Sequence, residues 1–184
     1  GAAPAAKAWR RPEAMNASVS QEQPPTSLGD VTRVPWSEIK DTTGSAAAIP
    51  FLLAALASGD DAAARTALYG LRNRICRYGF VVDEATAVTV PFLWELVQRP
   101  QVTCRAQILR LLRNIAVTRQ WETTAAAYPK VRRRHGDHIA WESAARQAVR
   151  AHSVAIERLL HERDTELVHA TEELASALAA SHTA

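Results

Sequence analysis

Two pairs of side chains in the C-terminal half of the chain have the spacing of metal ligands. His135 and His138 stand three residues apart, and Glu166 and His169 repeat that spacing. A mononuclear site needs three or four such ligands, and a di-iron bundle needs a second Glu-x-x-His copy with two further glutamates on facing helices. The sequence supplies neither set, so we expect no metal site and no cofactor.

No other pattern indicates a catalytic centre. The chain lacks a glycine-rich phosphate loop and the nucleophile elbow of a serine hydrolase. Its two cysteines, Cys76 and Cys104, are expected on parallel helices, too far apart for a disulfide. We therefore expect a protein that is not an enzyme, with both thiols reduced in a cytoplasmic setting.

Arginines on two predicted helices are the main candidates for binding. Guanidinium groups pair with carboxylates and phosphates through two parallel hydrogen bonds, so these helices favour an anionic partner. An Arg next to an Asn occupies the same two positions in both helices. The candidate residues are Arg72, Arg74, Arg110, Arg113 and Asn114. The alternative is that this arginine-rich sequence simply exposes arginines to water.

A second basic stretch lies in residues 120–139, which we expect to be an irregular insertion. Three consecutive arginines, Arg132, Arg133 and Arg134, follow Trp121 and Tyr128 there. Aromatic residues interleaved with arginines are typical of proteins that bind single-stranded nucleic acid. We expect this loop to close one edge of the basic face, and the alternative is a solvated excursion.

The candidate arginines must be positioned by helices, because the sequence repeats with a helical spacing. Ile-Pro-Phe-Leu at 49–52 recurs as Val-Pro-Phe-Leu at 90–93, and an Arg followed by apolar residues at steps of 3, 3 and 4 begins at Arg65 and again at Arg105. Those steps mark one face of an α-helix. Each unit is therefore predicted to hold two helices, with Pro50 and Pro91 early in the first one, where they end or kink the preceding turn.

This two-helix period of about 40 residues resembles that of HEAT-repeat proteins. The matching pieces are Ala-Ile-Pro-Phe-Leu-Leu-x-x-Leu at 48–56, the segment 84–96 around the second Pro-Phe-Leu, and Val-Arg-Ala-His at 149–152. They are similar to HEAT repeats of the armadillo-like class, especially a small group from GC-rich bacteria without a general activity. The resemblance implies an all-α fold, a short right-handed α-solenoid of about three helix pairs whose second helices line the concave face. It also implies a distant enzymatic alternative, the HEAT-like DNA glycosylases, by fold analogy alone.

Composition agrees with a single helical domain preceded by a tail. The 184 residues are 47% hydrophobic with a formal net charge of +3 and contain seven glycines, which argues against an all-β fold. We expect a flexible Pro-rich leader at 1–35 and a repeat domain at 36–181, with units at about 45–79, 83–119 and 140–180. No apolar run reaches the length of a membrane span, and no secretory signal is visible.

Together these features predict a non-catalytic module that binds a protein or peptide. Its Arg-rich concave face would meet an acidic or extended partner. The alternative is a nucleic-acid-binding protein that uses the same basic face. The sequence carries no signal for an oligomeric state.

Overall fold

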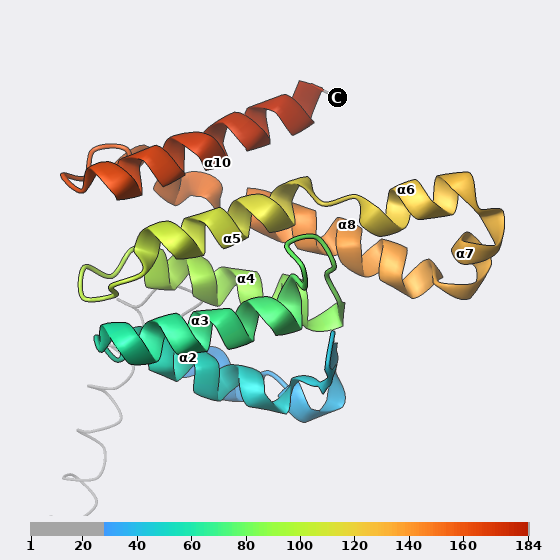
Figure 1. Cartoon of the computed structure of the whole chain (residues 1–184), viewed down its shortest axis with the longest axis horizontal. Coiled ribbons are helices and arrows are strands. Elements are labelled where there is room, and N and C mark those ends of the chain that lie inside the picture. The colour runs from blue at the N-terminus through green and yellow to red at the C-terminus, as the bar shows by residue number, and fades with distance from the viewer. Residues whose placement is uncertain (1–27, 184) are drawn as a thin grey trace, which may run out of the picture.

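The structure, a computed structural model, describes residues 28–183 as an almost entirely helical chain (Figure 1). This confirms the all-α prediction. The helices are α2 (Ile49–Ala57), α3 (Asp61–Ile75), α4 (Glu84–Val97), α5 (Arg105–Val117), α6 (Gln120–Ala127), α7 (Pro129–Arg134), α8 (Gly136–Ala151), α9 (Ile156–Leu159) and α10 (Thr165–Thr183). The remaining regular elements are the 3₁₀ turns η1 (Leu28–Arg33), η2 (Trp36–Glu38), η3 (Ala46–Ala48) and η4 (Ser153–Ala155), and the strands β1 (Lys40–Asp41) and β2 (Gly44–Ser45).

Aspartates set the starts of three main helices. The Asp60 carboxylate accepts hydrogen bonds from the first amides of α3, and Asp164 does the same for α10. Asp83 and Thr86 form a reciprocal capping box at the start of α4. Each cap satisfies amides that have no partner within their own helix, which fixes where the helix begins.

The helices pack in neighbouring pairs around one core. α2 packs against α3, α4 packs against α5 and α8, and α5 also packs against α10. Figure 1 shows α3, α5 and α10 lying one above another, with α4 behind α5. The buried Trp94 ties α4 to α8, because its Nε1 donates to the carbonyl of Val149 at 3.1 Å.

The two repeated prolines lie in different places. Pro50 is in the first turn of α2, as expected, but Pro91 lies inside α4. The prediction of an early position is wrong for Pro91, since α4 begins seven residues before it. Proline removes one backbone hydrogen bond from a helix interior, and the buried side chains of Phe92, Leu93 and Trp94 compensate by packing the surrounding turns into the core.

The folded domain begins earlier than the sequence indicates. Residues 1–27 of the predicted leader lie outside the described part of the chain, but residues 28–35 are packed against the domain. Val31 is buried, and its carbonyl accepts a 2.7 Å hydrogen bond from Nε1 of the buried Trp36. The prediction of a flexible leader up to residue 35 is therefore wrong for its last eight residues.

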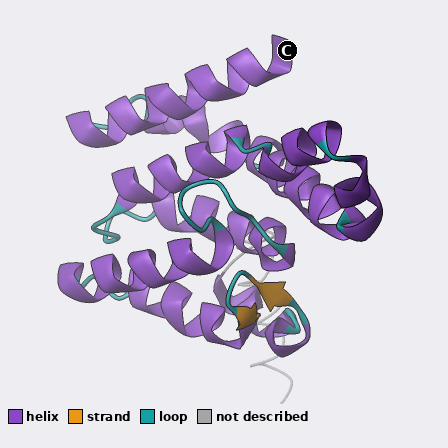
Figure 2. Cartoon of the chain, turned by 45° about the vertical axis from the view of Figure 1, so that its right-hand side comes forward, coloured by secondary structure: helices purple, strands orange, loops and turns teal. Residues whose placement is uncertain are grey.

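The segment 120–139 is helical rather than irregular. It forms α6, α7 and the start of α8, and α6 and α7 project sideways from the body as an arm (Figure 2). The carboxylate of Glu142, on α8, is buried and accepts hydrogen bonds from the backbone amides of Trp121 (2.8 Å) and Glu122 (3.1 Å). A carboxylate 20 residues away in sequence thus caps α6, which explains why local sequence predicts a loop here.

Candidate binding groove

A groove of about 300 Å³ separates α3 from α5. Its lining comes from residues at helical spacing on both helices: Arg65, Leu68, Tyr69, Arg72, Cys104, Gln107, Arg110, Leu111 and Asn114. The floor is apolar, since Leu111 and Cys104 are buried and Leu68 is half-buried. Polar and charged groups stand on the two walls, so the groove can hold an apolar side chain and an anionic group together.

Arg72 and Asn114 lie at one end of the groove, beneath a tight turn. The turn contains Gly79, whose positive φ of 86° puts it in the left-handed region that favours glycine. A Cβ atom at this position would come within 3.3 Å of the Arg72 guanidinium and 3.8 Å of the Asn114 amide nitrogen. The absence of a side chain at Gly79 therefore leaves room for both of these side chains at this end of the groove.

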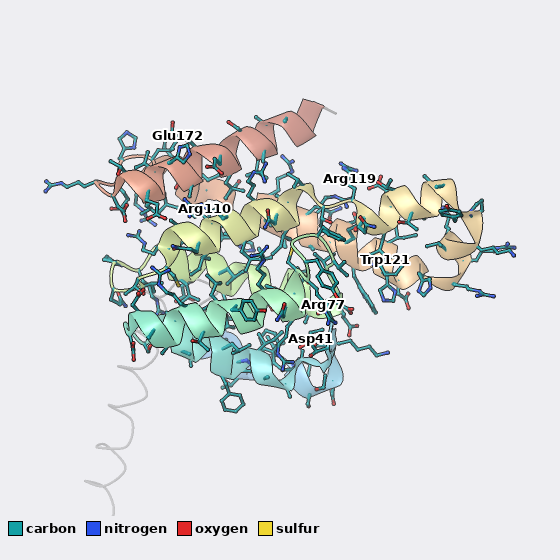
Figure 3. All side chains as sticks on the ribbon, viewed as in Figure 1. Asp41, Arg77, Arg110, Arg119, Trp121 and Glu172 are labelled. Atoms are coloured by element: carbon teal, nitrogen blue, oxygen red, sulfur yellow. The ribbon has the colours of Figure 1, made fainter. Side chains whose placement is uncertain are left out.

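Arg110 carries the other main positive charge of the groove. Figure 3 labels it on the face of α5 that is turned toward the viewer. Its Nη1 lies 3.1 Å from Oε1 of Glu166 on α10, and both side chains remain in contact with water. Arg65, on the α3 wall, pairs with Asp61 of its own helix at 2.9 Å.

Two predicted binding residues face away from this groove. The Arg74 guanidinium donates to the fully buried carboxylate of Asp41 (2.9 Å) and to the Thr43 hydroxyl (2.8 Å), so it holds the β1–β2 hairpin. Residues two positions apart on a helix are rotated by about 200° around its axis, so Arg74 and Arg72 point to nearly opposite sides of α3. Arg113 points toward α10, where it lines a shallow hollow with Glu172 and Glu173.

The three consecutive arginines also lie elsewhere. Arg132, Arg133 and Arg134 are exposed on α7, at the far end of the arm from the groove (Figure 1). They do not close its edge as the sequence suggests. The reason is that α6 and α8 carry α7 outward.

The two aromatic residues of the arm differ in exposure. Trp121, labelled at the base of the arm in Figure 3, is half-buried, and its ring packs at a tilt of 39° against His138, with ring centroids 4.5 Å apart. His138 in turn contacts Trp141 at 4.9 Å. Tyr128 is 65% exposed. Of the two, Tyr128 is therefore the one free to stack on a ligand.

Tyr69 is a groove residue that the sequence does not single out. It is 71% exposed and stands on the α3 wall. The signal is present, because Arg65, Tyr69 and Arg72 follow the i, i+4, i+7 spacing of one helix face. Two further exposed aromatic residues, Tyr78 and Phe80, lie in the turn beside the groove.

The cysteines are packing residues in this arrangement. Burial raises the pKa of the Cys76 thiol to about 12 and also raises the pKa of Cys104 on the groove floor. Both remain protonated at neutral pH, so the groove floor is uncharged. A thiol is a far weaker nucleophile than a thiolate.

The His135 and His138 rings, predicted not to form a metal site, pack edge to face with centroids 5.3 Å apart. Within residues 28–183, no three His, Cys, Asp or Glu side chains gather closely enough to hold a metal ion. No helix in the described range is both long and apolar enough to cross a bilayer. In comparison with known proteins, the chain matches no protein family, no curated protein and no solved structure.

Proposed function

We propose that this protein is a non-catalytic binding module that takes an extended acidic peptide of a partner protein in the groove between α3 and α5. Its helix pairs α2–α3 and α4–α5, followed by α8 to α10, would form a short HEAT-type α-solenoid. The order and packing of the helices support this. α2 and α4 are each followed by a helix that lines the groove, α3 and α5, and α8 and α9 are followed by α10, which packs on α5.

The combination of an apolar floor with cations on both walls carries the proposal. A small apolar side chain of a peptide would rest on Leu68 and Leu111, while its neighbouring carboxylates reach Arg72 and Arg110. Tyr69 adds a large, partly apolar surface at the rim. Tyrosine and arginine are the residue types that dominate the energetics of protein interfaces.

Asn114 gives the groove a group suited to peptide backbone. Its amide can both donate and accept hydrogen bonds, and it lies beside Arg72 at the end of the groove. An extended peptide has unpaired N–H and C=O groups that require such a partner when they are desolvated. The groove therefore offers apolar, anionic and backbone contacts in one place.

Fluorescence anisotropy with a labelled ten-residue peptide of alternating Glu and Leu tests this function. A peptide with Gln in place of Glu is the control ligand. We expect the acidic peptide to bind at least about tenfold more tightly than the Gln peptide, since a charge-assisted hydrogen bond is roughly twice as strong as a neutral one.

A charge-reversal pair locates the site. Arg72→Glu combined with Arg110→Glu should weaken the acidic peptide by more than about 30-fold, because truncating one partner of a charge pair alone costs about 2 kcal/mol or more. Arg113→Glu, compared with the single variant Arg110→Glu, is the charge-matched control, since Arg113 lies on the same helix outside the groove. Equal loss in these two single variants, or equal binding of the two peptides, would contradict the proposal.

A second candidate function, nucleic acid binding, is favoured by the charge on α7. Its four cations, Lys130 and Arg132 to Arg134, are all exposed, and none forms an ion pair within the described residues. Successive residues point about 100° apart, so the cations surround the helix except near the half-buried Val131. Such an arrangement fits phosphates on two sides, as in a groove of a duplex.

Salt dependence separates this candidate from the first one. Duplex and single-stranded DNA and RNA would be titrated from about 50 to 200 mM salt, where phosphate binding falls log-linearly. Replacing the three arginines of α7 by alanine should reduce the slope by about three, roughly one for each lost phosphate contact. No binding at the lowest salt would eliminate this candidate.

A further inference from the structure

Glu166 places a carboxylate of the protein itself on Arg110, one of the cations of the groove. Its Oε1 lies 3.1 Å from Nη1 of Arg110, and its side chain is 56% exposed. An exposed pair of this kind contributes little to stability. The contact is therefore easily exchanged for another carboxylate.

The same carboxylate also influences the opposite wall. The pKa of Arg65 is raised chiefly by its hydrogen bond with Asp61, and Glu166 adds a smaller electrostatic contribution. Arg65 is on α3 and Arg110 is on α5, so the charge of Glu166 acts on both sides of the groove.

Glu166 keeps a favourable environment when it leaves Arg110. It stands in the first turn of α10, where its backbone amide is capped by Asp164 at 3.0 Å. Negative charge near a helix N-terminus is stabilised by the helix dipole. Release of Arg110 thus costs the fold little.

We propose that Glu166 is a resident competitor for the acidic ligand: a ligand carboxylate binds the groove by displacing Glu166 from Arg110. This inference rests on the proposed function of the groove. The exchange breaks one ion pair and forms another, with no change in protonation. Glu166 thereby raises the threshold for binding, so that weakly acidic peptides do not displace it.

Glu166→Gln tests the exchange, with Glu162→Gln as a matched control. Both variants remove one negative charge, and the two residues are four positions apart in the sequence. Glu162 pairs at 2.8 Å with Arg105, which does not line the groove. The long-range electrostatic effect on an acidic ligand is therefore almost the same in the two variants. Only Glu166→Gln removes the partner of a groove cation, Arg110.

We expect Glu166→Gln to tighten binding of the alternating Glu-Leu peptide about two- to fivefold, the range that corresponds to an exposed ion pair. Glu162→Gln should change it by less than about 1.5-fold, and the Gln-Leu peptide should gain nothing from either variant. That selectivity for a charged ligand would not arise from a merely structural change at α10.

Three results overturn the inference. If Arg72→Glu with Arg110→Glu abolishes peptide binding but Glu166→Gln leaves it unchanged, the groove function stands and the exchange is wrong. An equal gain in both glutamate variants also contradicts the exchange, since it indicates a general charge effect. If neither the wild type nor any variant binds the acidic peptide up to about 1 mM, the proposed function and the exchange fail together.

Discussion

The groove between α3 and α5 and the arm of α6 and α7 are both rich in arginine, yet they hold it in opposite ways. In the groove, Arg72 and Arg110 stand over an apolar floor, and Arg110 already has a carboxylate partner. On the arm, Arg132 to Arg134 are exposed in several directions around one short helix. The first arrangement selects a shaped ligand with charge at fixed positions. The second attracts negative charge without prescribing a shape.

The two regions also differ in the interactions that hold them together. The body is held by apolar packing of α2 to α5 with α8 and α10. The arm depends on a polar network in which the buried Glu142 caps α6 and Arg146 bridges to Glu122 at 3.1 Å. Loss of one polar group should therefore affect the arm far more than the groove.

Glu142→Ala is expected to have the largest effect of the changes that follow. It leaves two amides of α6 without their acceptor and leaves the Arg146 guanidinium with Glu122 as its carboxylate partner, and breaking such a buried network costs about 3 kcal/mol. Hydrogen exchange should show loss of protection at Trp121 and Glu122, while the acidic peptide still binds. Glu157→Ala, at an exposed position on α9, is the control. Loss of peptide binding along with the arm would break the contrast between the two regions.

Replacement of one exposed tyrosine in each region is expected to have a moderate effect in only one. Tyr69→Ala should weaken the acidic peptide about fivefold, near 1 kcal/mol, because it removes an aromatic wall of the groove. Tyr128→Ala, which removes a comparably exposed ring from the arm, should leave peptide affinity unchanged. Anisotropy titrations of the two variants side by side would sharpen the contrast, and equal losses would contradict it.

The smallest expected effect concerns Asp83, which lies between body and arm. Burial raises the pKa of this carboxyl, against the opposing hydrogen bond from the Glu84 amide and the opposing charge of His138 on α8. Since the folded pKa exceeds the unfolded one, the ionised carboxylate destabilises the fold at pH 7, and this cost disappears as the pH falls through the folded pKa and below the unfolded value.

Asp83→Asn should therefore stabilise the fold by raising the free energy of unfolding at pH 7. This gain should be smaller in size than the losses expected for Glu142→Ala and Tyr69→Ala. Asn still caps α4. The advantage should vanish below about pH 3.8, the ordinary pKa of the side chain. Denaturant titrations of both proteins at pH 7 and pH 3.5 measure this, and a gain that persists at the lower pH would show that the charge is not its cause.

Much of the fold can be predicted from the sequence, because it depends on local patterns. The 3, 3, 4 spacing after Arg65 and Arg105 marks α3 and α5, and the acidic cap residue Asp164 marks α10. Three of the predicted binding residues, Arg72, Arg110 and Asn114, line the same groove. These positions follow from helix periodicity once the two units are aligned.

The errors come from contacts that no local pattern encodes. Arg74 pairs with Asp41, which is 33 residues away, and Glu142 folds a segment whose local sequence predicts a loop. Val31 is held by the indole of Trp36, so the end of a Pro-rich tail becomes part of the domain. Asp41 and Glu142 are buried partners 20 or more residues away, and Trp36 is a buried partner on the other side of the predicted domain boundary.

The contact of α10 with α5 also has a consequence for the order of folding. The pairs α2–α3 and α4–α5 join residues that are near neighbours in the chain, whereas Arg105–Glu162 and Arg110–Glu166 each close a loop of more than 50 residues. Local contacts form faster than distant ones, because less chain entropy is lost in forming them. During synthesis from the N-terminus, α3 and α5 are therefore expected to assemble first. α10 would dock on α5 later, and Arg110 would first meet its internal partner Glu166 only after α10 has been made.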